Sequence, residues 1–313
     1  MPVVLDPDAA AVYKAFQEAG RPAYESLTAP EAREYYRAAR IVSNPEPPAL
    51  DSSNELAIPA PHGAIPARIY TPKTLRKTDG LAPCLMFFHG GGWVIGDLDT
   101  HEVVCQKLAH EGELIVISVD YRLAPEHRFP AAVDDAVTAT RWLAANAGDL
   151  GIDASRLIVG GDSAGGNLAA VVALTARDGG PKLAAQLLVY PATDFSRKHP
   201  SHREPETSIL LTHSVIGWFG NHYLGDADDS DWRASPARAE DFAGLPPAYV
   251  LTAGADPLRD EGDEYATFLR DAGVPVTYRH FPGQFHGFFT MGKLLNQANV
   301  AVTEISAWLK AQG

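Results

Sequence analysis

The sequence has few cysteines, few basic residues and no long apolar run. Its two cysteines, Cys84 and Cys105, cannot form a disulfide framework, and no residues near them have metal-ligand spacing. With 26 basic against 39 acidic residues the net charge is −13, which argues against nucleic acid and anionic membranes as partners and mildly favours cationic substrates. No apolar run approaches the roughly 18 residues that cross a bilayer.

The first residues also lack a basic segment followed by an apolar one, so no secretory signal is expected. We therefore expect a cytoplasmic protein with reduced thiols. Its composition, 46% hydrophobic and 21% charged, is typical of a globular enzyme. The 313 residues suffice for one large α/β domain, or for a core with a smaller appendage.

Short apolar runs alternate with longer helical ones through most of the chain. The predicted strands are Cys84–Phe88, Leu114–Asp120, Leu157–Gly160, Gln186–Tyr190, Ala248–Gly254 and Val276–Phe281. The predicted helices are Glu102–Glu111, Ala131–Ala145, Gly165–Arg177, Glu261–Ala272 and Gln297–Ala311. Before the first of these strands, two extended runs separated by His62 and Gly63 predict a hairpin. Near-continuous apolar strands joined by helices are typical of an α/β fold with a parallel sheet covered on both faces.

Two segments depart from this alternation. Residues 1–45 contain two helical stretches, Ala9–Ala19 and Pro30–Val42, and end at a proline-rich linker. About 57 residues separate two of the predicted strands, too many for a structureless loop, and they include a helical piece at Thr212–Leu224. We expect residues 1–45 and the insertion 195–230 to form a cap over the carboxyl edge of the sheet, with the core formed by residues 46–194 and 231–313.

A G-x-S-x-G motif places Ser163 between a predicted strand and a predicted helix. The motif alone is weak, but a strand–turn–helix setting is what a nucleophile elbow requires. The sharp turn needs glycine on both sides of the serine and holds the hydroxyl at the start of a helix. The alternative is a glycine-rich turn that binds phosphate. We predict that Ser163 is the nucleophile of a serine hydrolase.

Three successive glycines follow His89 at the end of another predicted strand. Such a run is costly in chain entropy, which indicates that the backbone itself approaches a ligand, although a flexible loop is the simpler alternative. In acyl transfer, the N–H groups of Gly91 and Gly92, with that of Ala164 after the nucleophile, would form an oxyanion hole. His89 precedes the serine and is expected to orient the loop.

A serine nucleophile needs a base and an acid that orients the base. In proteins with a nucleophile elbow of this kind, both follow the serine along the chain, first the acid and then the histidine. The strand Ala248–Gly254 leads into Ala255 and Asp256, so Asp256 is the best candidate for the acid. His286 lies in the loop after the last predicted strand, and His280 within that strand is the second choice. Asp260 and Asp263 are expected to cap a helix. His199, His202, His213 and His222 precede Asp256 and are assigned to the cap.

No metal site is predicted. The sequence contains no HExxH motif, and the pair His199 and His202 lacks a convincing third ligand. The acidic run at Asp226 resembles half of a calcium loop, but its sixth position is Asp231 instead of glycine and its twelfth is Ala237 instead of glutamate. We expect this run to be a solvated loop.

Taken together, these motifs resemble those of the bacterial hormone-sensitive-lipase-like (family IV) esterases of the α/β-hydrolase superfamily. The matching segments are HGGGW at 89–93, DYRLAPEHRFPAAVDD at 120–135, GDSAGGN at 161–167, DPLRDEG at 256–262 and HGF at 286–288. The resemblance covers roughly residues 65–308. It implies an eight-stranded, mostly parallel sheet, a helical cap, and hydrolysis of short- to medium-chain acyl esters without a cofactor.

Two other functions use the same scaffold. The plant gibberellin receptor resembles this family but lacks the catalytic histidine, whereas this chain has His286. An amidase or peptidase would use the same triad of Ser163, Asp256 and His286, and the sequence does not exclude it. We expect a small ester and water as the partners of the site, and a homodimer is possible.

An apolar substrate pocket is expected beside the nucleophile. The candidates for its lining are Trp93 from the oxyanion loop and Leu210, Leu211, Trp218, Phe219 and Tyr223 from the insertion. Aromatic residues at helical spacing are also typical of a packed core, so each of these assignments has that alternative.

Overall fold

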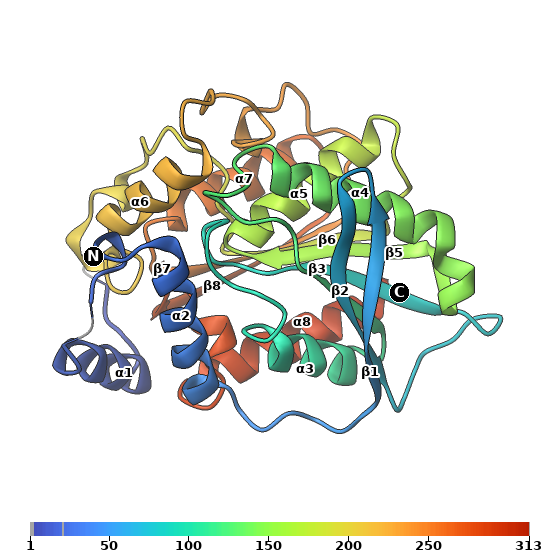
Figure 1. Cartoon of the computed structure of the whole chain (residues 1–313), viewed down its shortest axis with the longest axis horizontal. Helices are drawn as coiled ribbons and strands as arrows, with labels where there is room; N and C mark the ends of the chain where they lie inside the picture. The colour runs from blue at the N-terminus through green and yellow to red at the C-terminus, as the bar shows by residue number, and fades with distance from the viewer. Residues whose placement is uncertain (1–2, 21, 313) are drawn as a thin grey trace.

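The computed structural model describes residues 3–20 and 22–312, and an eight-stranded sheet crosses its centre (Figure 1). The strand order is β1-β2-β4-β3-β5-β6-β7-β8. The hairpin strands β1 and β2 pair antiparallel, β2 is antiparallel to β4, and all pairs from β4 to β8 are parallel. The strands are β1 Leu50–Ala60, β2 Gly63–Pro72, β3 Ala82–Phe88, β4 Ile115–Val119, β5 Ile152–Asp162, β6 Ala185–Val189, β7 Ala248–Ala255 and β8 Val276–Phe285. The predicted fold class is confirmed.

Helices cover both faces of the sheet. In Figure 1, α4, α5 and α7 lie above the sheet, and α3 and α8 lie below it. Two separate apolar cores correspond to these layers, the first with side chains of α4, α5 and α7 and the second with side chains of α3 and α8. The helices are α3 Glu102–Gly112, α4 Ala131–Asn146, α5 Ala164–Arg177, α7 Arg259–Asp271 and α8 Asn296–Gln312.

The central strands are almost entirely apolar because both of their faces are covered. Every residue of β3, β4, β6 and β7 is buried. Every predicted strand and helix of the core exists, with ends that differ by a few residues. The largest differences are at β5, which begins at Ile152, and at β8, which continues through Pro282 and Gly283 to Phe285. His286 therefore follows the strand directly, with no intervening loop.

Three further helices lie at the carboxyl edge of the sheet, and we name them the cap helices. They are α1 Pro7–Glu18, α2 Ala29–Ser43 and α6 His213–Tyr223, grouped at the left of Figure 1. Thr28 and Glu31 form a reciprocal capping box at the start of α2, and the Thr212 side chain accepts the Val215 N–H at the start of α6. Tyr24 joins the two parts of the cap, because its ring contacts those of Trp218 and Phe219.

Within the described ranges, no helix has the length and apolar character to cross a membrane.

Candidate active site

Ser163 occupies the tight turn between β5 and α5. Its backbone has φ 56° and ψ −118°, a region that non-glycine residues rarely adopt, and it is the N-cap of α5. Its N–H donates to the carbonyl of Val189 on the neighbouring strand at 2.8 Å, which helps to hold the turn. The hydroxyl is consequently presented at the carboxyl edge of the sheet, at the start of a helix.

The glycines on either side of Ser163 are required by close backbone contacts. A Cβ at Gly161 would lie 2.3 Å from the carbonyl oxygen of Phe88, and a Cβ at Gly165 would lie 1.9 Å from the same atom. Atoms cannot approach so closely, so the end of β3 packs directly on the backbone of this turn. The two glycines fix the distance between the serine and the loop that follows β3.

Ser163, His286 and Asp256 form one hydrogen-bonded chain. The His286 Nε2 lies 2.8 Å from the Ser163 Oγ, and its Nδ1 lies 2.8 Å from an Asp256 carboxylate oxygen. Asp256 is fully buried, and its other oxygen accepts the Leu258 N–H at 2.8 Å. The three side chains come from the ends of β5, β7 and β8. Their geometry is that of a base held between a nucleophile and an orienting carboxylate.

Three backbone N–H groups surround the space beside Ser163. Gly91 and Gly92 have φ of 125° and 57°, in the positive region that favours glycine, and a Cβ at Gly91 would lie 2.1 Å from the Ile95 carbonyl oxygen. Among the described residues, the N–H groups of Gly91, Gly92 and Ala164 have no hydrogen-bond acceptor. All three residues line the same cavity as Ser163. They are available to bind an oxyanion.

Asp162 ties the glycine loop to the serine turn, a role that the sequence analysis missed. One of its carboxylate oxygens accepts the Gly90 N–H at 2.9 Å and lies 3.2 Å from the His101 Nε2. Burial opposes the ionised form of Asp162, but His101 and the Gly90 N–H outweigh it and hold the pKa of Asp162 below its usual value. Because the carboxylate is buried and ionised, it holds the loop firmly.

His89 is placed as a support of the loop, away from the reacting atoms. Its Nδ1 lies 2.9 Å from the Gly90 carbonyl oxygen, and its ring stacks on Tyr121 at a centroid distance of 4.3 Å. Burial is the main cause that lowers the pKa of His89 to about 4, so the ring is neutral at physiological pH.

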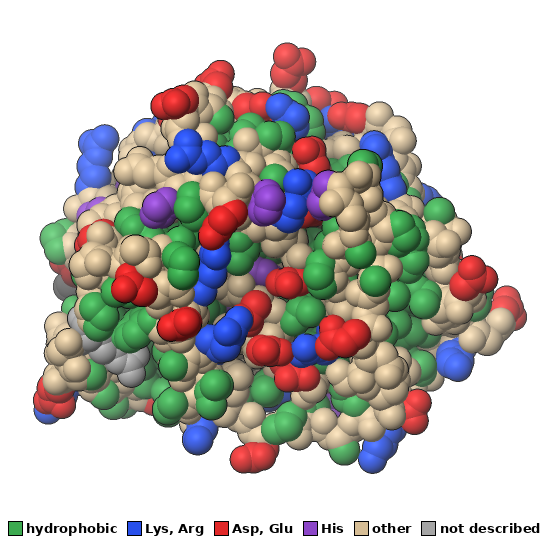
Figure 2. All heavy atoms as spheres, in the orientation of Figure 1, with side chains coloured by type: hydrophobic (Ala, Val, Ile, Leu, Met, Phe, Trp, Pro, Cys, Tyr) green, Lys and Arg blue, Asp and Glu red, His purple; other side chains and the backbone are tan. Residues whose placement is uncertain are grey.

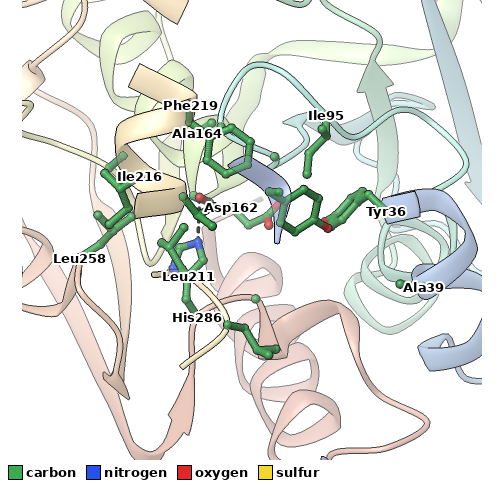
Figure 3. A pocket seen from close by; sticks show the side chains of 18 of the residues that line it. Tyr36, Ala39, Ile95, Asp162, Ala164, Leu211, Ile216, Phe219, Leu258 and His286 are labelled. Atoms are coloured by element: carbon green, nitrogen blue, oxygen red, sulfur yellow. Dashed lines mark hydrogen bonds between the residues drawn. The ribbon is translucent and has the colours of Figure 1, made fainter. Parts of the chain in front are cut away.

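A cavity of about 620 Å³ opens beside Ser163, between the sheet edge and the cap helices. Figure 3 shows Ile216, Leu211 and Phe219 on one side of it and Tyr36 and Ala39 of α2 on the other. Of the predicted lining residues, Trp93, Leu210, Leu211 and Phe219 are present. The sequence analysis did not predict the contribution of α1 and α2.

Trp218 and Tyr223 are not among the residues that line the cavity, so their assignment to the pocket was wrong. Trp218 lies on α6 one residue before Phe219, and a step of about 100° around the helix turns it away. Its ring packs on Tyr24 and His222. Tyr223 is buried and stacks on Trp93 at 4.3 Å, so it supports the wall from behind.

The remaining candidates lie outside the triad. His280 contacts the Thr252 hydroxyl at 2.9 Å, and Asp260 accepts the Ser201 N–H. His202 is buried against Glu261, with 2.7 Å between Nε2 and a carboxylate oxygen. Burial opposes the charged imidazole, but the Glu261 carboxylate outweighs it and raises the pKa of His202.

Within the described residues, one trio has donor atoms close enough for a metal ion: Asp194, His199 and Glu264. Asp194 already contacts the cationic groups of Arg238 and Lys198, at 3.2 and 3.4 Å. Its charge is therefore balanced without a metal, and the trio is explained as an ion-pair network.

Known proteins share the sequence over most of its length. A family model described as the α/β hydrolase fold matches residues 85–290. The carboxylic ester hydrolase LipN of Mycobacterium tuberculosis is 45% identical over 265 residues, which are 82% of this chain and 69% of that protein. The ethyl acetate hydrolase of Pseudomonas putida is 40% identical over 309 residues, 94% of this chain and 95% of that protein.

Solved structures agree over nearly the whole chain. An ester hydrolase from the metagenome of Lake Arreo, complexed with a derivative of bipyridine phosphonate, has a TM-score of 0.94 at 42% identity and covers 98% of this chain and 99% of its own. A thermostable esterase of Pseudomonas putida has a TM-score of 0.94 at 35% identity, and the match covers 100% of this chain and 98% of that esterase. The chain belongs to the α/β-hydrolase superfamily and, within it, to the hormone-sensitive-lipase-like esterases.

Proposed function

We propose that this protein is a carboxylesterase that hydrolyses short- to medium-chain acyl esters through an acyl-enzyme on Ser163. The observation that carries the proposal is the continuous chain from Ser163 through His286 to the buried Asp256, with 2.8 Å at each step. A receptor-like relative without chemistry would not need this arrangement. The relatives named above support ester hydrolysis as the reaction.

The proposed mechanism uses only side chains, backbone amides and water. His286 removes the Ser163 proton as the hydroxyl oxygen attacks the ester carbonyl, and Asp256 holds the imidazole in the orientation that this requires. The N–H groups of Gly91, Gly92 and Ala164 stabilise the oxyanion. His286 then protonates the leaving alcohol, and water attacks the acyl-enzyme by the same route.

The proposed substrate range follows from the cavity. A volume of about 620 Å³ lies within the range of small-molecule sites, and its lining is mostly apolar. Short and medium acyl chains suit such a site. A cytoplasmic location and a homodimer stay predictions, since no structural finding tests them.

Turnover of nitrophenyl esters from acetate to palmitate tests the proposal. We expect a preference among the shorter esters, and Ser163→Ala should lower kcat on the order of 10⁶-fold, the scale found when a serine nucleophile is removed. Ser155→Ala is the matched control, because Ser155 is exposed on the same strand. Faster turnover of matched amides than of esters would favour the amidase alternative, and a preference for palmitate would contradict the acyl range.

A further inference from the structure

Arg40 places a positive charge in the wall of a mostly apolar cavity. It lies on α2 and lines the cavity together with Tyr36, and its guanidinium carbon lies 4.7 Å from the centre of the Tyr36 ring. One guanidinium nitrogen is 3.4 Å from the position of a Cβ at Gly287, the residue after His286. The charge is therefore close to the catalytic histidine.

The Arg40 guanidinium has no anionic partner in the described part of the chain. Its side chain interacts with that of Tyr36, but no carboxylate oxygen lies within 4.0 Å of the guanidinium, and its buried Nε has no hydrogen-bond acceptor. A buried guanidinium nitrogen normally has a partner, because an unmade charged hydrogen bond costs more than a neutral one. No carboxylate of the described residues therefore balances the charge of Arg40.

The carboxylates that line the same cavity are engaged elsewhere. Each accepts backbone N–H groups or contacts another cation. Asp8 accepts the N–H groups of Ala9 and Asn296, and Asp162 accepts the Gly90 N–H. Asp194 contacts Arg238 and accepts the Ser196 N–H. Glu261 accepts the Thr193 N–H and contacts His202.

A second arginine in the cavity wall, Arg197, differs from Arg40 in this respect. Its guanidinium donates to the Ile216 carbonyl at 3.3 Å and packs against Gly220 of α6. Arg197 therefore has a backbone carbonyl as its acceptor, whereas Arg40 has only the Tyr36 side chain as a partner and no acceptor for its Nε. Arg40 is the better candidate for a ligand-binding group.

We propose that Arg40 binds a carboxylate of the substrate, so that the preferred esters carry an anionic group on the part that reaches toward α2. This inference rests on the proposed esterase function. The planar guanidinium fits a carboxylate through paired hydrogen bonds, and the surrounding apolar wall strengthens the attraction. The net charge of −13 would by itself disfavour anions. Figure 2 shows acidic, basic and apolar side chains interspersed on one face, so the excess acidic residues form no continuous acidic patch on that face.

Matched ester pairs test this inference. In the first pair the carboxylate is on the acyl part of the ester, and nitrophenyl hydrogen glutarate is compared with nitrophenyl hexanoate. In the second pair the carboxylate is on the alcohol part, and 4-acetoxybutyrate is compared with pentyl acetate. The measured quantity is kcat/KM for the anionic ester divided by that for its neutral partner, after subtraction of the uncatalysed rate. Arg40→Gln should lower this ratio about 10- to 100-fold for one of the two pairs, and Arg40→Lys should retain part of it.

Lys14→Gln is the control, since it removes one positive charge from an exposed position on α1. We expect this variant to leave the ratio within about twofold, because exposed charges are screened. An unchanged ratio in Arg40→Gln, or a larger loss in Arg197→Gln, would overturn the assignment to Arg40. Turnover of the neutral esters reports separately on the proposed esterase function, and thermal melting shows whether each variant is folded.

Discussion

The backbone of Ser163, at φ 56° and ψ −118°, stores strain where the proposed chemistry takes place. Strained backbone of this kind persists only when the surroundings hold it. Here the surroundings are the Val189 carbonyl, which accepts the Ser163 N–H, and the end of β3, which packs against Gly161 and Gly165. The proposed reactivity of the hydroxyl therefore depends on backbone contacts behind the turn as well as on the triad.

Gly165→Ala is expected to destabilise the protein by about 3 kcal/mol and to lower kcat about 10²-fold or more, because the new methyl group would overlap the Phe88 carbonyl. Gly148→Ala is the control, since nothing lies within 4 Å of a Cβ there. Urea unfolding and ester turnover measure both effects. Equal behaviour of the two variants would show that the contact between β3 and the turn is not required.

Asp120 gives a pH-dependent prediction. Burial, with the nearby Asp97 and Asp99, raises the pKa of Asp120 to about 6. The folded protein therefore holds this proton more tightly than the unfolded chain, whose carboxyl has an ordinary pKa of 3.8. The contribution of Asp120 to stability is complete below about pH 4 and is lost as the pH rises through about 6.

Asp120→Asn should consequently raise the free energy of unfolding by about 1–2 kcal/mol near pH 8, and by much less near pH 4. The exposed Asp149→Asn is the control for the loss of one negative charge. Urea unfolding at the two pH values provides the measurement. An increase in the free energy of unfolding that is the same at both pH values would contradict the view that an ionised, poorly solvated Asp120 destabilises the protein.

Among the elements, α6 does more than cover the cavity. The Phe219 ring packs directly against the Gly92 backbone, since a Cβ at Gly92 would lie 2.2 Å from a ring carbon. The cap and the glycine loop are therefore in contact at a residue that we assign to the oxyanion hole. Movement of α6 would therefore change the position of the N–H group that we propose binds the oxyanion.

Phe219→Ala is expected to lower kcat about 10- to 100-fold, because the glycine loop loses its support and small displacements of catalytic groups reduce rates strongly. Trp218→Ala removes the neighbouring aromatic residue of the same helix, which does not line the cavity, and should change kcat much less. Melting temperatures separate loss of stability from loss of turnover. A similar fall in kcat for both variants would mean that α6 acts only through overall stability.

Elements of the core could be predicted because their patterns are strong and local. Buried strands such as β3 and β7 are nearly continuous apolar runs, and α5 follows a glycine-rich turn. The end of β8 is harder to predict from the sequence, because proline and glycine, here Pro282 and Gly283, usually end a strand. In the structure, pairing with β7 nevertheless continues to Phe285. The order and type of elements are thus visible in the sequence, while their ends depend on tertiary contacts.

The cap and the cavity could be predicted only in part. Trp218 and Phe219 are adjacent aromatic residues, and only the rotation of α6 against the core decides which one faces the cavity. Arg40 lies in an ordinary amphipathic helix, and no motif distinguishes it from Arg37, which is exposed and paired with Asp97. Asp162 lies within the serine motif, but its contact with Gly90 needs the sheet order, which places β3 beside β5.

At the scale of the whole molecule, the fold brings together residues that are far apart in the chain. Ser163 and His286 are 123 positions apart, and Asp256 precedes His286 by 30. Parallel pairing aligns the carboxyl ends of β3, β5, β7 and β8 at one edge, where ligands bind in open α/β sheets. The site therefore exists only in the complete sheet, and unfolding the sheet should abolish all reactivity of Ser163.

Covalent labelling with a fluorophosphonate, followed by mass spectrometry of the digested protein, tests the central claim most directly. We expect a single adduct on Ser163, formed by the folded protein, strongly slowed in His286→Ala and absent after denaturation. Esterase activity that persists with no adduct on Ser163, or an adduct on another residue that accompanies loss of activity, would contradict the account.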